Sequence, residues 1–441
     1  MSTPSKLPAP GALVRRLDRT DALAIALGGV IGVGVFRTTG LVLAGTGGLG
    51  AATAIWLAIG VVCLAGAILY GDLAARVPEV GGPYAYVRVA FGRRAAFVYG
   101  WLNAGVEIPV RQASVMAVIG EVLAAWWPAI GARAFAVAAL VVLTGLNLIG
   151  VHAGALAQRV FTLGKIGTIL LVIGLALAAL IDHGGAVAPV DGAVVAGASF
   201  ATAVAAVWYT YLGWQDVVLL AEEVHDPGRN LRAVLVATVA VVIVLYTAIH
   251  LAIYVGLGGG SAARAQMPVT SLAAGTLGAA GVTALSLLML SSMIGGAAEG
   301  LMVRPRMALA LARDGFAPRW LTAVGASGAP YGALLANSAV VLVLVATGGF
   351  AELLPLLVFA GGLLGVFETA SYFVVRRRRP ELPTARFHPW APLAFVLANL
   401  ALCALEGAHD PLRAGIAVGA VLALTVGHAV ATLRRPVASA A

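Results

Sequence analysis

Among the ionisable side chains inside long apolar stretches, four have types and positions that could do chemistry. Glu107 and Arg111 lie four residues apart, while Lys165 and Glu299 each stand alone. Glutamate four residues before arginine places both on one helix face, in the order that favours an ion pair. Ionisable residues in apolar spans usually face a bundle interior or a water-filled path, so these side chains indicate movement of an ion or a polar solute.

Lys165 has a specific interpretation because it is one of only two lysines in a chain whose other cations are arginines. A buried lysine can lose its proton, whereas an arginine stays charged. We therefore predict that Lys165 gains and loses a proton during a functional cycle. The alternative is a lysine that snorkels to the membrane surface, since Arg159 lies only six residues earlier.

The other charged residues in or beside the apolar spans leave alternatives open. Glu107 and Arg111 either satisfy each other as an ion pair or contact a substrate, and Glu299 accepts either a cationic group or a proton. Glu368, in a later apolar span, is interpreted either as a packed, hydrogen-bonded residue or as a functional one. Arg37 lies just beyond a glycine-rich stretch and either lines an outer vestibule or snorkels to the outer interface.

The composition indicates that membrane-spanning helices position these residues. Of 441 residues 61% are hydrophobic, only 11% are charged and 55 are glycine, which excludes an ordinary water-soluble globule. Apolar runs of about 20 residues, enough to cross a bilayer as helices, recur along the chain. With ends soft by several residues, the twelve expected spans are 22–45, 51–74, 95–125, 134–152, 160–181, 197–221, 233–257, 278–312, 332–349, 353–375, 390–407 and 412–432.

Charge and cysteine placement narrow the class of protein. The net charge is +9, but the cations lie between apolar runs rather than along one stripe, which excludes nucleic acid as a partner. Most of these cations, Arg304 and Arg306 among them, are counted in every second connection between spans. Because cytoplasmic connections carry an excess of Lys and Arg, this predicts a multi-pass plasma-membrane protein (cell inner membrane if bacterial) with both termini cytoplasmic. Cys63 and Cys403 lie within spans and indicate neither a disulfide nor a metal site.

Two interruptions of the apolar spans point to a transporter. Gly28–Phe36 contains four glycines, which weaken a helix, and Tyr209–Asp216 interrupts the span that comes five spans later. Paired breaks are typical of inverted-repeat transporters, in which half-helix ends bind substrate near the bilayer midplane. Free N–H groups there attract a carboxylate and free carbonyls an ammonium, so a zwitterion fits. The alternative for the glycines is close helix packing.

Other classes are less compatible with the sequence. The seven histidines are scattered without an acidic or nucleophilic partner, so we predict that the protein is not an enzyme. No filter-like loop or ring of charge indicates a channel, and no glycine-rich loop ending in Lys-Ser or Lys-Thr indicates ATP use.

Several segments together resemble the amino acid, polyamine and organocation (APC) transporters. The matching segments follow the family's order through about the first three quarters of the chain: Gly28–Phe36, Gly81–Tyr86, Asn147–Val151, Tyr211–Trp214, Ala221–Asn230 and Ala312–Pro318. The resemblance implies an all-α membrane protein of the LeuT type that works by alternating access. Its single domain, 1–441, would comprise a five-helix repeat (22–181), its inverted copy (197–375), broken first and sixth helices, and two peripheral helices (390–432).

The resemblance also implies a binding site between helices one, three, six and eight. The backbone N–H groups of Val33 and Gly34 would hold the substrate carboxylate. The carbonyls of Val30, Tyr209 and Leu212, next to Gly213, would hold the ammonium, with the Tyr209 ring as a gate. The substrate side chain would lie against the face that carries Glu107, Arg111, Gln112 and Glu299.

Lys165 matches the position where sodium sits in sodium-coupled relatives. Gln215 stands where some exchangers have a glutamate, which removes one proton-binding group. The expected function is therefore proton-coupled amino acid symport, with proton-independent exchange as the alternative. No cofactor is expected beyond the proton as coupling ion; the partners are an amino acid and the bilayer, for a monomer or homodimer with or without another subunit.

Overall fold

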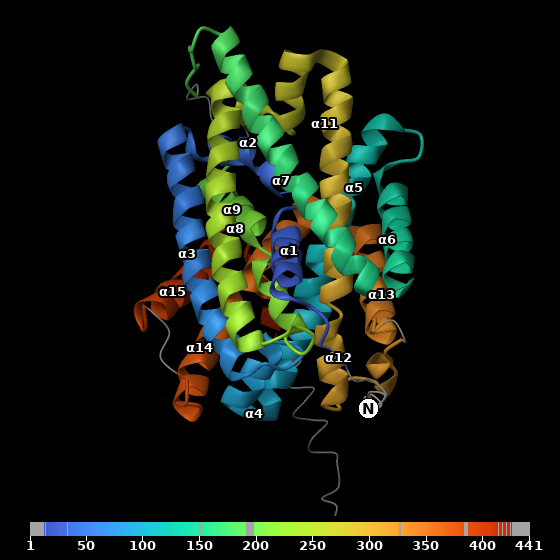
Figure 1. Ribbon diagram of the computed structural model, residues 1–441. Coiled ribbons are helices and arrows are strands. Elements are labelled where there is room, and N and C mark those ends of the chain that lie inside the picture. The colour runs from blue at the N-terminus through green and yellow to red at the C-terminus, as the bar shows by residue number, and fades with distance from the viewer. Residues whose placement is uncertain are drawn as a thin grey trace, which may run out of the picture.

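The computed structural model is a bundle of helices in which α1 lies near the centre (Figure 1). It describes residues 13–425 apart from 14, 33, 150, 191–197, 326–327, 349, 383–386, 413, 417, 420 and 424, and leaves the side chains of 151–157 and 350–356 undescribed. In chain order the elements are α1 (Arg19–Val30), α2 (Gly34–Thr46), α3 (Leu49–Arg76), α4 (Pro83–Leu102), the π-helix η1 (Asn103–Glu107), α5 (Ile108–Trp126), α6 (Ala132–Ile149), α7 (Val151–Asp182), α8 (Phe200–Tyr211), the 3₁₀-helix η2 (Trp214–Leu220), α9 (Pro227–Leu257), α10 (Gly259–Arg264), α11 (Pro268–Val303), α12 (Arg306–Arg313), the 3₁₀-helix η3 (Arg319–Thr322), α13 (Tyr331–Thr347), α14 (Phe350–Arg378) and α15 (Trp390–His409).

Eight segments among the described residues are long and apolar enough to cross a membrane, or nine if α1 and α2 count as one bent span. Two of the expected spans are represented by shorter helices, the 17-residue α13 and the 12-residue α8. The expected final span, 412–432, extends beyond the described residues. The count of twelve spans therefore stays a prediction.

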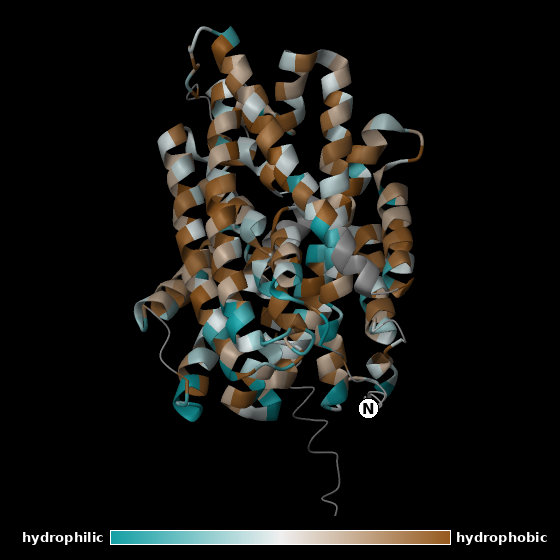
Figure 2. Ribbon diagram, viewed as in Figure 1, coloured by the Kyte–Doolittle hydropathy of each residue, from teal (hydrophilic) through white to brown (hydrophobic). Residues whose placement is uncertain are grey.

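The outer helices present apolar side chains outward, as expected of surfaces that face lipid. Val142 on α6 and Leu163 and Ile181 on α7 are 59%, 71% and 76% exposed. Figure 2 shows hydrophobic residues along these helices and a gathering of hydrophilic residues at the lower end of the view. Water does not reach the hydrocarbon core, and these helices can present such surfaces there because their backbone groups are paired internally.

The break between α1 and α2 is narrower than the sequence predicts. Gly28 and Gly29 remain helical; α1 ends at Val30, Ile31 is extended (φ −77°, ψ 91°), and α2 begins at Gly34 at an angle of 41°. A Cβ at Gly28 would lie 2.7 Å from Oε1 of Gln158 on α7. These glycines therefore also serve the close packing that the sequence left as the alternative.

The second break, between α8 and η2, requires glycine. After α8 ends at Tyr211, Leu212 is extended (φ −68°, ψ 145°) and Gly213 adopts φ 119°. An L side chain is strained at that angle, and a Cβ there would lie only 2.4 Å from the carbonyl oxygen of Gly29. The absence of a side chain at Gly213 lets the two broken segments touch.

The third span begins close to where the sequence predicts it. The sequence indicates a turn and an interfacial piece, or a plain loop, around Pro78–Tyr86, with the span starting at 95. Gly81 and Gly82 (φ 85° and 42°) form a turn that leads into a first helical segment of α4, and this segment ends at a kink at Gly92 (φ 82°, ψ −174°). The second segment of α4 follows the kink and continues through η1 into α5. Arg88, in the first segment, lies 2.8 Å from Asp314.

Candidate functional site

A cluster of six buried ionisable residues lies where α5, α7, α11, η1 and η2 approach α1. Each side chain belongs to a residue no more than 5% exposed, and three are acidic and three basic. The buried charge cluster consists of Glu107, Arg111, Lys165, Asp216, Glu299 and Arg304. Charges removed from water are tolerated only where partners compensate them, so the arrangement within the cluster decides its chemistry.

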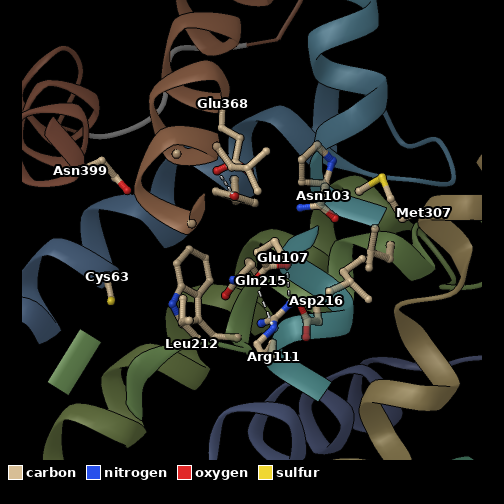
Figure 3. A pocket seen from close by; sticks show the side chains of 18 of the residues that line it. Cys63, Asn103, Glu107, Arg111, Leu212, Gln215, Asp216, Met307, Glu368 and Asn399 are labelled. Carbon is tan, nitrogen blue, oxygen red and sulfur yellow. Dashed lines mark hydrogen bonds and ion pairs between the residues drawn. The ribbon is translucent and has the colours of Figure 1, made fainter. Parts of the chain in front are cut away.

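Arg111 links α5 to the second helix break. Its Nη2 donates to Oδ1 of Asp216 at 2.9 Å, and its Nε lies 3.2 Å from Oε1 of Glu107 (Figure 3). The ion pair that the sequence offers for Glu107 and Arg111 is therefore present. Asp216, at the start of η2, joins the pair and was not assigned this role from the sequence.

Arg304 holds the other oxygen of Asp216. Its Nε donates to Oδ2 at 2.9 Å, and its Nη1 donates to Oε1 of Gln112, also at 2.9 Å. Gln112 in turn donates to the carbonyl of Ala297 at 3.0 Å, so its amide ties α5 to α11. Arg304 was expected among the cations in the connections between spans; instead its side chain is buried, and the residue is 4% exposed.

Arg306 was also expected among the cations between spans. It is fully buried instead, and its Nη2 donates to Oε2 of Glu223 at 2.9 Å. Both arginines stand at the end of an apolar span, where counting charges cannot separate a solvated cation from a buried one. The signal that was available for Arg304 is Glu299, five residues earlier.

Lys165 and Glu299 meet the last turn of α1. The Nζ of Lys165 donates to the carbonyl oxygen of Gly28 at 2.5 Å. A Cβ at Gly29 would lie 3.0 Å from all three carboxyl atoms of Glu299. Lys165 is therefore not a snorkelling lysine: it is 1% exposed and bonded to the helix that precedes the break.

The backbone groups predicted to bind substrate already have protein contacts. The carbonyl of Val30 accepts from the hydroxyl of Tyr246 at 2.7 Å, and that of Tyr209 accepts from the N–H of Leu212 at 3.1 Å. A carbonyl oxygen has a second lone pair, so each can accept another donor. A Cβ at Gly34 would lie 2.6 Å from Oγ1 of Thr210, which brings α2 against α8. Val33 lies outside the described residues.

A cavity of about 60 Å³ adjoins the cluster. Figure 3 shows Glu107, Arg111, Gln215 and Asp216 around it, with Leu212 from the second break. Of the predicted site residues, Glu107, Arg111 and Leu212 line this cavity, whereas Lys165 and Glu299 contact α1. The predicted residues thus form two neighbouring groups, joined through Asp216 and Arg304.

Glu368 also lines the cavity, and its role is now defined. It accepts hydrogen bonds from the hydroxyls of Tyr70 and Tyr99, the latter at 2.5 Å. These bonds join α3, α4 and α14, which fits the hydrogen-bonding interpretation. The side-chain amide of Gln215 accepts from the N–H of Gly213 at 3.1 Å and so stabilises the second break.

A second cavity, of about 310 Å³, lies beside α2, α5 and α11. Arg37 and Glu121 line it and form an ion pair at 2.8 Å. The vestibule interpretation of Arg37 therefore has a cavity to match. Among the described residues, no group of three His, Cys, Asp or Glu side chains is placed to hold a metal ion.

Comparison with known proteins gives a consistent result. The sequence profile of the family described as "Amino acid permease" matches residues 17–424. The chain is 24% identical over 427 residues to the large neutral amino acids transporter small subunit 2 of Rattus norvegicus, covering 93% of this chain and 79% of that protein. It is 31% identical over 355 residues to an uncharacterised transporter of Mycobacterium bovis, covering 77% and 75%.

The fold has a solved counterpart. It resembles Mhp1, a nucleobase-cation-symport-1 family transporter solved in a closed conformation with bromovinylhydantoin bound, with a TM-score of 0.57. The match covers 94% of this chain and 96% of that one at 16% sequence identity. At that identity the likeness shows a shared transporter fold and nothing about the substrate.

Proposed function

Because the chain belongs to the amino acid permease family, we propose that it moves amino acids across the plasma membrane by alternating access, driven by protons. It is a transporter and not an enzyme, as its relatives are. The two breaks are the proposed binding site for the zwitterionic part of the substrate, since half-helix ends offer N–H groups to a carboxylate and carbonyls to an ammonium. The proposed orientation has both termini in the cytoplasm.

The observation that carries proton coupling is the hydrogen bond from Lys165 to the Gly28 carbonyl. A protonated lysine donates a charge-assisted bond to this carbonyl, and a neutral lysine donates a weaker one. The proton on Lys165 therefore controls how firmly the last turn of α1 is held. A proton that alters one half of a broken helix is a direct route to coupling proton movement to access.

The test is uptake of radiolabelled L-leucine, L-alanine, L-arginine and L-glutamate into proteoliposomes. Three conditions are compared: an inward proton gradient, an inward sodium gradient, and vesicles preloaded with unlabelled amino acid without a gradient. Accumulation driven by protons alone supports symport. Uptake confined to preloaded vesicles replaces symport with exchange, and no uptake of any of the four overturns the proposed substrate class.

Lys165→Ala isolates the coupling step. We expect it to remove proton-driven accumulation while leaving some substrate binding, because the substrate contacts proposed here are backbone groups. Binding is measured as protection of the purified protein against thermal unfolding by the transported amino acid. Full proton-driven accumulation by this variant would contradict the coupling role of Lys165.

A further inference from the structure

Glu299 is the one acidic residue of the buried charge cluster without a close cationic partner. Asp216 receives hydrogen bonds from Arg111 and Arg304, and Glu107 lies 3.2 Å from Arg111. Glu299, which is fully buried, reaches only Nη2 of Arg304, at 3.9 Å. Neither of its carboxyl oxygens accepts a hydrogen bond within the described part of the chain. An ionised carboxylate left this way in an apolar interior is costly.

Charge balance connects Glu299 to Lys165. Glu107, Arg111, Asp216 and Arg304 cancel one another, which leaves Lys165 and Glu299 as the remaining base and acid of the cluster. If Lys165 lost its proton to water, an uncompensated negative charge would stay buried. If the proton moved to Glu299 instead, both groups would be neutral and the total charge of the cluster would not change.

The geometry allows such sharing. Gly296 and Glu299 lie three residues apart on α11 and so share a helix face. A Cβ at Gly296 would lie 3.4 Å from Nζ of Lys165, and one at Gly29 would lie 3.0 Å from the Glu299 carboxyl group. Lys165 from α7 and Glu299 from α11 therefore flank consecutive residues of α1, Gly28 and Gly29. The other charges acting on Glu299 are Arg304, Asp216 and Arg111.

We propose that Glu299 is the second proton-binding group of the transporter and shares one proton with Lys165 across the last turn of α1. In one state the ammonium of Lys165 bonds to the Gly28 carbonyl beside an ionised Glu299. In the other, the N–H bond breaks and an O–H bond forms on Glu299, so Lys165 is a neutral amine. The proposal rests on the proton-driven transport proposed above and adds the group that receives the proton.

The experiment compares Glu299→Gln, Lys165→Ala and the double variant Lys165→Ala/Glu299→Gln in proteoliposomes. L-Leucine is the probe, or whichever amino acid of the panel the unsubstituted protein takes up fastest. Two rates are measured: exchange into preloaded vesicles without a gradient, and accumulation under an inward proton gradient with proton entry followed by a pH-sensitive dye inside the vesicles. Glu406→Gln is the matched control, since Glu406 is another buried carboxylate with an unpartnered oxygen, on α15.

For Glu299→Gln we expect proton-driven accumulation and proton entry to fall by about tenfold or more relative to the exchange rate of the same variant, because the amide preserves the shape but binds no proton. Lys165→Ala should slow exchange as well, since it leaves Glu299 unbalanced. The double variant should exchange faster than Lys165→Ala, because both members of the charge pair are gone. Glu406→Gln should match the unsubstituted protein in both assays.

Normal proton entry with Glu299→Gln would overturn the proposal while leaving proton-coupled transport intact. If Glu299→Gln fails to fold, the double variant decides: exchange no faster than that of Lys165→Ala would also overturn it. If the unsubstituted protein exchanges amino acids but never responds to protons, shared proton binding is wrong although transport stands. If it moves no amino acid, the proposed function itself fails.

Discussion

Glycine at the contact between α2 and α8 lets the two broken helices approach each other closely. Gly34 is the first residue of α2, and a Cβ there would lie 2.6 Å from Oγ1 and 2.9 Å from Cα of Thr210. Backbone cannot yield to such a contact as a flexible side chain can. Thr210 also bonds to Thr38 at 2.9 Å, so any displacement reaches further along α2.

Gly34→Ala should therefore force α2 away from α8 and weaken substrate binding. Overpacking of this kind costs about 1–3 kcal/mol, and we expect amino acid exchange to fall by about tenfold or more. Exchange in preloaded proteoliposomes is the measurement. Gly145→Ala on the exposed face of α6, where a Cβ would meet nothing within 4 Å, is the control and should exchange normally. Normal exchange by Gly34→Ala would mean that this contact does not shape the site.

Asp18 stabilises the start of α1 as its N-cap, and its carboxylate accepts from the N–H of Asp21 at 2.7 Å. That bond lowers the pKa of Asp18 below its ordinary value, and Arg159 adds to the effect. A lowered folded-state pKa contributes stability above the unfolded value and loses it as the pH falls through the folded one. Stabilisation by this cap should therefore be full at neutral pH and disappear in acid.

Asp18→Ala should destabilise the purified protein by about 1 kcal/mol at neutral pH, the usual worth of a helix N-cap. The difference in melting temperature from the unsubstituted protein should shrink as the pH is lowered below about 4, where a free aspartate becomes protonated. Asp18→Asn keeps a capping oxygen without a charge and should show a smaller deficit with no such pH dependence. Equal melting temperatures for Asp18→Ala and the unsubstituted protein at pH 7 would contradict the prediction.

The sequence could identify single charges but not their partners. Lys165, Glu107, Arg111 and Glu299 are recognisable because each interrupts an apolar run. Asp216 was seen only as part of the second interruption and Arg304 only as a cation between spans, because their pairing depends on how η2 turns back against α5 and α11. Pairing of this kind is a property of tertiary packing, and residue spacing along one helix does not contain it.

Helix breaks were predictable as elements, whereas their exact bounds were not. Glycine content located the first break, and the polar and aromatic residues of Tyr209–Asp216 located the second. Gly28 and Gly29 nevertheless stay helical, because α7 and α11 pack against them. The third span was predicted to start at 95, and the kink that separates it from the preceding helical segment of α4 lies close by, at Gly92. Low helix propensity indicates where a helix can break, and packing against neighbouring helices determines the residue at which it ends.

Substitution of Gly213 tests whether the conformation of the second break is required. Alanine there would have to adopt φ 119° and would place Cβ 2.4 Å from the Gly29 carbonyl oxygen. Gly92 in α4 also has a positive φ, 82°, but a Cβ there meets nothing within 4 Å. Gly92→Ala therefore carries only backbone strain, of about 1–3 kcal/mol at φ 82° and ψ −174°, whereas Gly213→Ala carries backbone strain and a clash.

We expect Gly213→Ala to lose exchange by about tenfold or more and Gly92→Ala to keep most of it, because only the first change pushes η2 away from α1. Both variants are compared in preloaded proteoliposomes after their melting temperatures are measured. If the two variants lose exchange equally, strain alone explains the effect, and contact between the two breaks is not required for transport.

Across the whole molecule, contacts at the predicted cytoplasmic end close the bundle. The N–H groups of Arg16 and Leu17 both donate to the carbonyl of Glu223, at 2.8 and 2.9 Å. The Glu223 side chain pairs with buried Arg306, and Glu222 pairs with Arg313. The segment after η2 therefore holds the start of α1 and α12 together, on the side of the bundle from which Met307 of α12 lines the cavity at the charge cluster.

Breaking the buried ion pair between Glu223 and Arg306 should open the cavity to the cytoplasm. Breaking a buried ion pair by removing one partner costs about 3–5 kcal/mol, whereas an exposed pair is worth about 0–1 kcal/mol.

The accessibility of Cys63 measures this opening. Cys63 is 4% exposed and lines the cavity, so it reports on opening when Cys403, the other cysteine of the chain, is replaced by serine. We expect Glu223→Gln to speed maleimide modification of Cys63 by about tenfold or more in inside-out vesicles. Glu222→Gln, whose pair with Arg313 is about one-third exposed, should change the rate little. Equally slow modification in Glu223→Gln and the parent would mean that closure at this end does not depend on the Glu223–Arg306 pair.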